Sequence, residues 1–246
     1  MNKTIEQIYN RKSVRVFEGR PITPETKDLI FRAALQAPTA GNQTLYTILD
    51  IVDPDMKKAL AVTCDNQPFI AKAPMVLIFL ADCRRWYDCY QSAGATCRKP
   101  GAGDLMLACL DAVIAAQNTV VAAESLGIGS CYIGDILEHV EAHEKMLHLD
   151  EYVLPIAMLV FGYPTEKQKK RSKPARFDKQ YIVQTNTYSR LPEKELRTMF
   201  QARHPEPDFD FDSYITAFCK RKYMSDFSLE MTRSVSKYWK RFDTWE

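Results

Sequence analysis

Residues 74–80 are the part of this sequence that most limits the fold. The run Pro-Met-Val-Leu-Ile-Phe-Leu is apolar throughout, is rich in β-branched and aromatic side chains, and ends just before Asp82. A continuous apolar run of this length predicts a strand in the centre of a sheet, because a strand at the centre is covered on both faces.

Helical and strand-like patterns alternate around this run. Thr23-Pro24 supplies a cap and a first-turn proline for a helix that ends before Pro38. Gly101 and Gly103 precede a long alanine-rich helix, Asp104 to Leu126, and Gly127 is its C-terminal stop. The patterns further predict strands at Leu45 to Val52, Ile128 to Ile133 and Leu154 to Phe161, short helices from Asp53-Pro54 and around Glu138 to Leu147, strand-like pieces at Tyr181-Ile182-Val183, and a C-terminal helix with Phe227, Met231, Val235 and Tyr238 on one face.

Composition bounds the class of protein. With 246 residues, 46% of them hydrophobic, the chain can bury one full core and carry an extension. A net charge of +2 gives no reason to expect a nucleic-acid or membrane surface. The longest apolar stretch, Leu105 to Leu126, contains polar residues such as Asp111 and Glu124, which predicts a buried helix rather than a membrane span. Seven cysteines, an odd number without a C-x-x-C pair, indicate free thiols in a reducing cytoplasm.

Arg11-Lys12-Ser13-Val14-Arg15 places three cations and a hydroxyl at a junction between a short helix and an extended segment. Arginine forks and a serine hydroxyl are suited to phosphate oxygens, so this turn is a candidate phosphate site. A solvated basic turn is the alternative.

Three later segments share the features of a ligand site. Ala37 to Gln43 ends a helix with small residues and then two amides, which match the donors and acceptors of an isoalloxazine or a nucleobase. Tyr132-Ile133-Gly134-Asp135 follows a predicted strand. Lys167 to Arg176 holds six cations and no acid, and we expect this basic loop to close over the phosphate held by Arg11 and Ser13. His139 and His143 are four residues apart and could face one metal ion, but we expect them to lie on a solvated helix face instead.

The order and spacing of these motifs along residues 5–176 resemble the FMN-dependent nitroreductase family, in its oxygen-insensitive, NADPH-preferring branch with a C-terminal helical extension. The resemblance implies an α+β fold, an α/β/α sandwich with a central mixed or antiparallel sheet flanked by helices. It implies an FMN-binding core at residues 1–180, and an extended arm and helical extension at 181–246 that packs on a partner. It also implies a homodimer with FMN at the subunit interface.

The same resemblance implies which residues contact FMN. Arg11, Lys12 and Ser13 match phosphate and ribityl contacts, and Arg15 matches a cation near flavin N1 that tunes the reduced flavin. No side chain is catalytic, since flavin N5 carries the chemistry. The remaining implied contacts are Asn42, Gln43 and Gln67 at the ring, Ile133, Gly134 and Asp135 through backbone, and Lys173 and Arg176 at the phosphate, with Arg171 as a competitor. Thr44 stands where many relatives have Gln, and Lys173-Pro174-Ala175-Arg176 replaces Lys-Pro-Arg.

The function implied is hydride transfer from NADPH or NADH through FMN to a small flat acceptor, a nitroaromatic, a quinone or a flavin, with ping-pong kinetics. Two alternatives remain at this point: a flavin-binding store or redox sensor without turnover, and an anion-binding module without flavin. The basic residues after Lys220 leave the role of the C-terminal helix open, with the 2′-phosphate of NADPH as one possible ligand of Arg203, Arg221 or Arg233.

Overall fold

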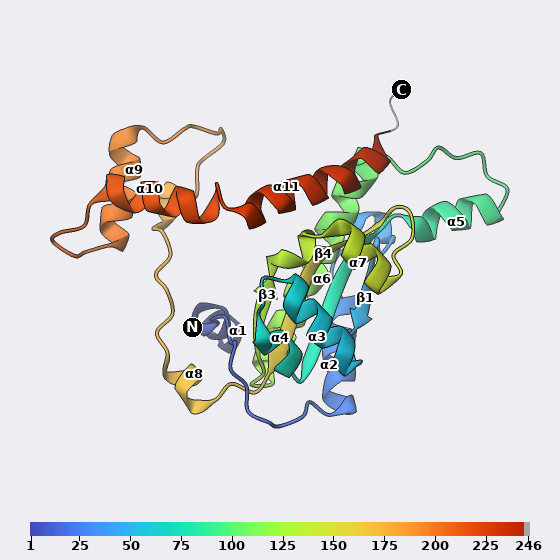
Figure 1. Ribbon diagram of the computed structural model, residues 1–246, viewed down its shortest axis with the longest axis horizontal. Helices are drawn as coiled ribbons and strands as arrows, with labels where there is room; N and C mark the ends of the chain where they lie inside the picture. The colour runs from blue at the N-terminus through green and yellow to red at the C-terminus, as the bar shows by residue number, and fades with distance from the viewer. Residues whose placement is uncertain (244–246) are drawn as a thin grey trace. The chain divides into compact units, whose positions relative to one another are not determined.

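The computed structural model describes residues 1–243 and divides the chain into two compact units (Figure 1). The core unit contains residues 1–171 and the chain from Glu230 onward. The second unit is Ser172–Leu229. The expected boundary at 180/181 therefore differs from the observed one, and the last helix, expected in the extension, returns to the core unit.

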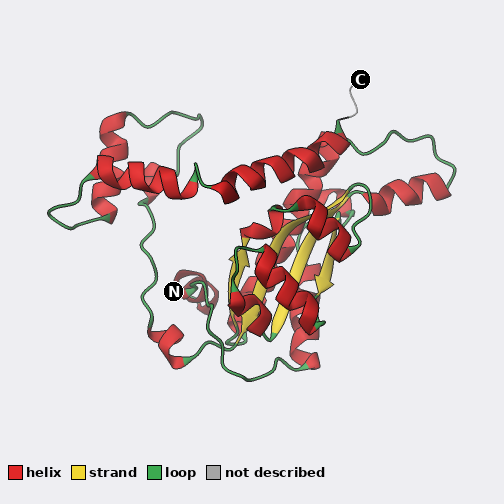
Figure 2. Ribbon diagram, viewed as in Figure 1, coloured by secondary structure: helices red, strands yellow, loops and turns green. Residues whose placement is uncertain are grey.

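The core is built on one antiparallel sheet whose strand order is β1-β2-β4-β3. Its strands are β1 (Tyr46–Asp50), β2 (Met75–Asp82), β3 (Gly129–Ile133) and β4 (Val153–Gly162). Every residue of β2 is buried, and β2 pairs with β1 on one side and β4 on the other. The central position predicted for residues 74–80 is thus confirmed, and β1 and β3 are the two edges. Figure 2 shows the strands enclosed between helices.

Alternate residues of β2 face two different helical layers. Met75, Leu77 and Phe79 share a core with α2 and α6, whereas Val76, Ile78 and Leu80 share a core with α3 and α4. This alternation is the two-residue period of a strand, and it makes the core an α/β/α sandwich. The helices of this unit are α1 (Lys3–Asn10), α2 (Pro24–Leu35), α3 (Pro54–Thr63), α4 (Pro68–Lys72), α5 (Arg84–Ser92), α6 (Ala102–Ser125), α7 (Val140–Leu147) and α8 (Glu166–Lys170), with the 3₁₀ turns η1 (Ala40–Asn42), η2 (Gly134–Leu137) and η4 (Lys240–Phe242).

The long helix α6 has one buried and one exposed apolar face. Its alanines Ala108, Ala112 and Ala116 are fully buried against the sheet. The opposite side exposes apolar side chains, among them Leu110, which is 54% exposed. By length and composition alone α6 could cross a bilayer, a test that a core helix also passes. We call the exposed residues Met106, Leu107, Leu110, Val113 and Ile114 the bare face of α6.

Helix α11 (Asp226–Trp239) is attached to the core through α7. The hydroxyl of Ser234, which is buried, accepts a hydrogen bond from the backbone N–H of Val140 at 3.1 Å. Arg233 forms a two-armed ion pair with Glu141 at 2.8 and 2.9 Å. Tyr238 and Phe242 complete the cluster at this end of the sheet. The apolar stripe expected on the C-terminal helix is therefore buried at Tyr238.

The second unit contains α9 (Glu193–Arg203), α10 (Phe211–Lys222) and the 3₁₀ turn η3 (Lys179–Tyr181). The break expected at His204 to Pro207 separates α9 from α10. The strand-like assignment of Tyr181 to Val183 is wrong: the Asp178 carboxylate accepts from the N–H of Gln180 and starts a 3₁₀ turn. Ile182 and Val183 are exposed, so the apolar residues that suggested a strand have no sheet to join.

Candidate functional site

The N-terminal segment runs beside the edge strand β3. Ser13 forms a parallel bridge with Ser130, and the N–H of Val14 donates to the carbonyl of Ser130 at 2.9 Å. The approach requires glycine at position 129, because a Cβ there would lie 2.5 Å from Val14 Cγ2. Val14 is buried, so its neighbours Ser13 and Arg15 point the other way, as expected for an extended chain.

Residues 163–171 lie along the same N-terminal segment. Phe17 bridges Pro164, and the N–H of Glu18 donates to the carbonyl of Tyr163. Lys12 Nζ donates to the carbonyl oxygens of Lys169 at 2.6 Å and Arg171 at 2.5 Å. Carbonyls at the end of a helix lack partners within it, which explains why α8 recruits this ammonium. Lys12 thus holds the start of the basic loop against the first cationic turn.

The later part of the basic loop falls in the second unit. Lys173 and Arg176 both lie beyond the boundary after Arg171. Their convergence with Arg11 on one phosphate therefore stays a prediction, as does the choice between them and Arg171.

Arg11 has hydrogen-bond donors that nothing in the described chain uses. Its Nε and one Nη are buried, and neither has a partner within residues 1–243. The guanidinium lies 5.9 Å from the ring centre of Tyr132 and lines a small crevice between α1 and α6. Buried charged donors without an acceptor are costly, so this position suits an anionic oxygen.

Ser130 is a candidate that the sequence analysis did not name. It pairs with Ser13, and its Oγ is buried without a hydrogen-bond partner among the described residues. The available signal was a hydroxyl residue inside the predicted apolar strand Ile128 to Ile133.

Gln67 and Asp135 meet at the end of β3. Gln67 Nε2 donates to the Asp135 carboxylate at 3.0 Å and to the carbonyl of Cys64 at 2.8 Å. Asp135 lies in η2, which follows Ile133 directly. Arg15 reaches the same region, with its guanidinium carbon 5.9 Å from the ring centre of Phe69 in α4. The structure therefore brings Gln67 together with Asp135, and it places Arg15 beside Phe69 of the helix that Gln67 precedes.

Asn42 and Gln43 lie at the opposite edge of the sheet, in and after η1, just before β1. Asp111 of α6 holds this loop by accepting from the N–H groups of Ala40 at 3.0 Å and Leu45 at 3.1 Å. Strands β2 and β4 separate this edge from β3. At about 4.8 Å per strand, the two edges are about 14 Å apart. One chain alone does not bring Gln43 to Arg11.

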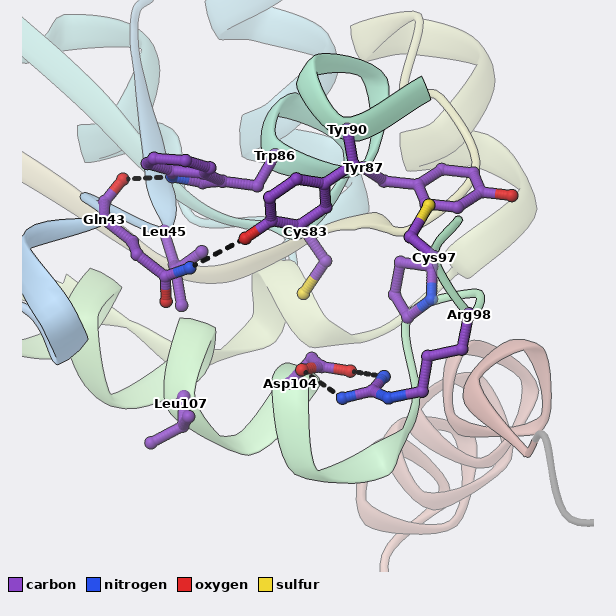
Figure 3. A pocket seen from close by; sticks show the side chains of 11 residues that line it. Gln43, Leu45, Cys83, Trp86, Tyr87, Tyr90, Cys97, Arg98, Asp104 and Leu107 are labelled. Carbon is purple, nitrogen blue, oxygen red and sulfur yellow. Dashed lines mark hydrogen bonds and ion pairs between the residues drawn. The ribbon is translucent and has the colours of Figure 1, made fainter. Parts of the chain in front are cut away.

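A cavity of about 310 Å³ opens beside Gln43 (Figure 3). The indole Nε1 of Trp86 donates to the carbonyl of Gln43 at 2.7 Å, and the Tyr90 hydroxyl lies 3.5 Å from the Gln43 amide nitrogen. Both aromatic residues belong to α5, which the sequence analysis did not predict. The cavity also borders Leu107, one residue of the bare face of α6.

Glu138, which follows η2 near the end of β3, has a strongly shifted pKa. Its side chain is 3% exposed, and burial together with the nearby Asp135 and Asp65 carboxylates raises its pKa to about 7.

His143 is buried and its pKa is lowered by that burial. One ring nitrogen of His143 lies 3.1 Å from the carbonyl of Ile136 and the other 2.9 Å from the Thr63 hydroxyl. Both nitrogens are thus engaged, and residues 1–243 contain no cluster of three or more His, Cys, Asp or Glu arranged for a metal.

Comparisons with known proteins place this geometry in a family. The profile of the Nitroreductase family matches residues 8–163, more than half of the chain. The chain belongs to the nitroreductase family, which confirms both the resemblance and the fold class.

Individual relatives agree with this assignment. The chain is 35% identical over 191 residues to an FMN reductase (NADPH) of Bacillus subtilis, covering 77% of this chain and 76% of the relative. It is 31% identical over 196 residues to an oxygen-insensitive NADPH nitroreductase of Salmonella typhimurium, covering 80% and 79%. The solved NfrA1 nitroreductase of B. subtilis superposes with a TM-score of 0.77 at 29% identity, covering 93% of this chain and 98% of that one.

Glu138 makes stability depend on pH. Its pKa is 4.5 in an unfolded chain and about 7 in the fold, so the folded state keeps a proton that the unfolded state releases. The free energy of unfolding should therefore fall as pH rises from 4.5 to 7, by up to about 3 kcal/mol at about 1.4 kcal/mol per pKa unit. Glu138→Gln should remove this fall and be the more stable protein at pH 8. Urea unfolding at pH 5, 6, 7 and 8 measures it, with the exposed Glu151→Gln as control; parallel pH curves for wild type and Glu138→Gln would contradict it.

Proposed function

We propose that this protein is an FMN-dependent oxidoreductase that passes reducing equivalents from NADPH or NADH to a small flat acceptor such as a nitroaromatic, a quinone or a free flavin. The observation that carries the proposal is the pair of buried nitrogens of Arg11 without a partner among residues 1–243, set on a segment that also places Arg15 beside Phe69 of α4. Family membership and the names of the relatives, an FMN reductase and an NADPH nitroreductase, support the same conclusion.

FMN, when bound, supplies the redox chemistry, and the chain supplies binding and electrostatics. Arg11 and Ser13 bind the phosphate, and Lys173 and Arg176 or Arg171 complete its shell from the basic loop. Arg15 places a positive charge near the pyrimidine end of the ring, where it favours the additional negative charge of the reduced state. Gln67 and the segment Ile133 to Asp135 orient the ring. A single open face that admits one flat substrate at a time accounts for ping-pong turnover.

We further propose that the active form is a homodimer with FMN between the subunits. The bare face of α6 offers five apolar side chains, each 38–54% exposed, to a second copy. A second copy also resolves the separation of the two sheet edges, because its Asn42 and Gln43 can lie beside the ring held at the β3 edge of the first. In this arrangement the second unit packs on the partner, and NADPH is the reductant in the cytoplasm, where free thiols persist.

A spectrum and a turnover assay test the function. The purified protein reconstituted with FMN should be yellow, and it should oxidise NADPH when a quinone or nitroaromatic is added, with parallel double-reciprocal lines. Flavin colour without NADPH oxidation would instead indicate a flavin store or redox sensor. A protein that stays colourless with FMN would be an anion-binding module.

Replacing Arg11 and replacing Arg15 should affect different properties of the bound flavin. Arg11→Ala removes a charged phosphate contact that contributes about 1.5–3 kcal/mol, so FMN should bind at least about tenfold more weakly. Arg15→Ala should lower the reduction potential of bound flavin with a smaller change in affinity. Flavin fluorescence titration and a potentiometric titration measure the two effects, with Arg32→Ala on the exposed side of α2 as the control. Wild-type affinity and potential in both variants would refute this placement of the flavin.

The bare face of α6 should control assembly. Leu110→Glu buries a charge in the proposed interface, so the protein should become monomeric and retain little FMN. Leu29→Glu is the matched control, because Leu29 on α2 is 56% exposed and Leu110 is 54% exposed. Light scattering coupled to size exclusion gives the mass of each variant. A dimeric Leu110→Glu protein with full flavin content would place the interface elsewhere.

A further inference from the structure

The amide of Gln67 can be oriented in only one way in this structure. Its nitrogen lies 2.8 Å from the Cys64 carbonyl and 3.0 Å from an Asp135 carboxylate oxygen. A carbonyl and a carboxylate only accept hydrogen bonds, so both amide hydrogens of Gln67 are used by the protein. The opposite orientation would set the amide oxygen against two acceptors. Gln67 therefore keeps its oxygen, an acceptor, for whatever lies on its remaining side.

Asp135 is itself held by a second carboxyl group. The N–H of Glu138 donates to the carbonyl of Asp135 at 3.0 Å, which closes the turn η2 and sets the two side chains together. The carboxyl groups of Glu138 and Asp135 interact directly. Glu138 Oε1 is buried and has no hydrogen-bond partner among the described residues. Two carboxylates so close cannot both ionise cheaply, so buried Glu138 keeps its proton up to about pH 7.

The surroundings of the pair keep that proton in place. Glu138 is approached by further acids, Asp65 after α3 and Glu230 of α11. Glu230 remains ionised because Arg233 lies at 2.8 Å, and its pKa is lowered to about 2. The imidazole of His143 is held neutral by burial, so it adds no positive charge. The charged and titratable groups facing Glu138 from the adjoining elements are Asp65, Asp135, His139, His143 and Glu230.

We propose that Asp135 and Glu138 are positioning residues for the flavin: Glu138 holds Asp135 in place, and Asp135 holds the Gln67 amide so that its oxygen accepts the N3–H of the pyrimidine edge. This inference rests on the proposed function, because it needs FMN at the β3 edge. It assigns to the Asp135 side chain a role beyond the backbone contact implied by the family resemblance, and it gives Glu138 a role for the first time. Loss of the Glu138 proton places two negative charges close together beside Gln67 and weakens this arrangement.

The experiment compares two ligands on the apoprotein. FMN and its N3-methyl analogue differ in the hydrogen that Gln67 is proposed to accept. Wild type should bind FMN at least about tenfold more tightly than the analogue, a loss typical of one hydrogen bond left unmade. In Asp135→Ala the freed amide can rotate and donate to a ring carbonyl instead, so the preference should fall to about threefold or less. Asp135→Asn keeps an acceptor for Gln67 and should restore it.

A pH series gives a second readout that a merely structural role would not change. The preference of wild type for FMN should decline above pH 7, where Glu138 loses its proton. Glu138→Gln keeps a buried hydrogen-bond donor beside Asp135 without a titrating group, so its preference should stay constant from pH 6 to 8.5. The infrared carboxylic-acid band of the apoprotein near neutral pH should also disappear in Glu138→Gln.

The outcomes separate this inference from the proposed function. A wild-type protein that binds neither ligand refutes the flavin site itself. Strong FMN binding with the same FMN preference in wild type and Asp135→Ala overturns the inference and leaves the function intact. If Asp135→Ala does not fold, the pH series with Glu138→Gln decides: identical pH profiles in wild type and variant overturn the inference.

Discussion

The pairing of the N-terminal segment with β3 is the interaction on which the candidate site depends. One short stretch of backbone contact, Ser13 and Val14 against Ser130, places Arg11, Ser13 and Arg15 along a sheet edge. Gly129 is required for it, since any larger residue would overlap Val14. The exposed edge of a sheet is open to added strands, and here the chain covers part of its own edge with the residues that define the site.

Two further contacts determine what this edge can bind. The Lys12 ammonium donates to the carbonyls of Lys169 and Arg171 and so organises the basic loop, whereas two buried nitrogens of Arg11 have no partner among residues 1–243. Gln67 donates its amide hydrogens to Cys64 and Asp135, so its oxygen remains available as an acceptor. The edge therefore offers charged donors at one end and an acceptor at the other. A mononucleotide with a phosphate tail and an N–H on its ring edge has the complementary order.

Much of the fold follows from local patterns in the sequence. The apolar run at 74–80, the capped helix at Thr23-Pro24 and the alanine-rich helix with Gly127 behind it all formed as predicted, because each combines a clear period with a stop signal. Helix α5 was missed because none of its residues is buried and most are exposed, so it contributes no run of core side chains. The strand prediction at Tyr181 to Val183 was wrong because β-branched and aromatic residues form a strand only where a sheet is available to pair with.

The site was predictable in its parts but not in its arrangement. Side-chain type singled out Arg11 and Ser13, whose chemistry suits phosphate, whereas Gln67 and the flavin role of Arg15 came from the family resemblance; their contacts with FMN stay a prediction. Glu138 carries no such signal in the sequence and Ser130 only that of a hydroxyl inside an apolar strand, because burial and the lack of a partner appear only in the fold. The separation of Gln43 from Arg11 likewise follows from strand order, which sequence spacing does not encode.

The return of the chain at Glu230 has a consequence for how the molecule holds together. The polypeptide leaves the core after Arg171 and rejoins it through α11, where Arg233 grips Glu141 and Ser234 caps the start of α7. The second unit is therefore an insertion that is joined to the core unit at both of its ends, not a C-terminal tail. A single proteolytic cut within it would leave α11 seated on the core by non-covalent contacts, so such a nicked chain can migrate as one particle in native conditions and separate only on denaturation.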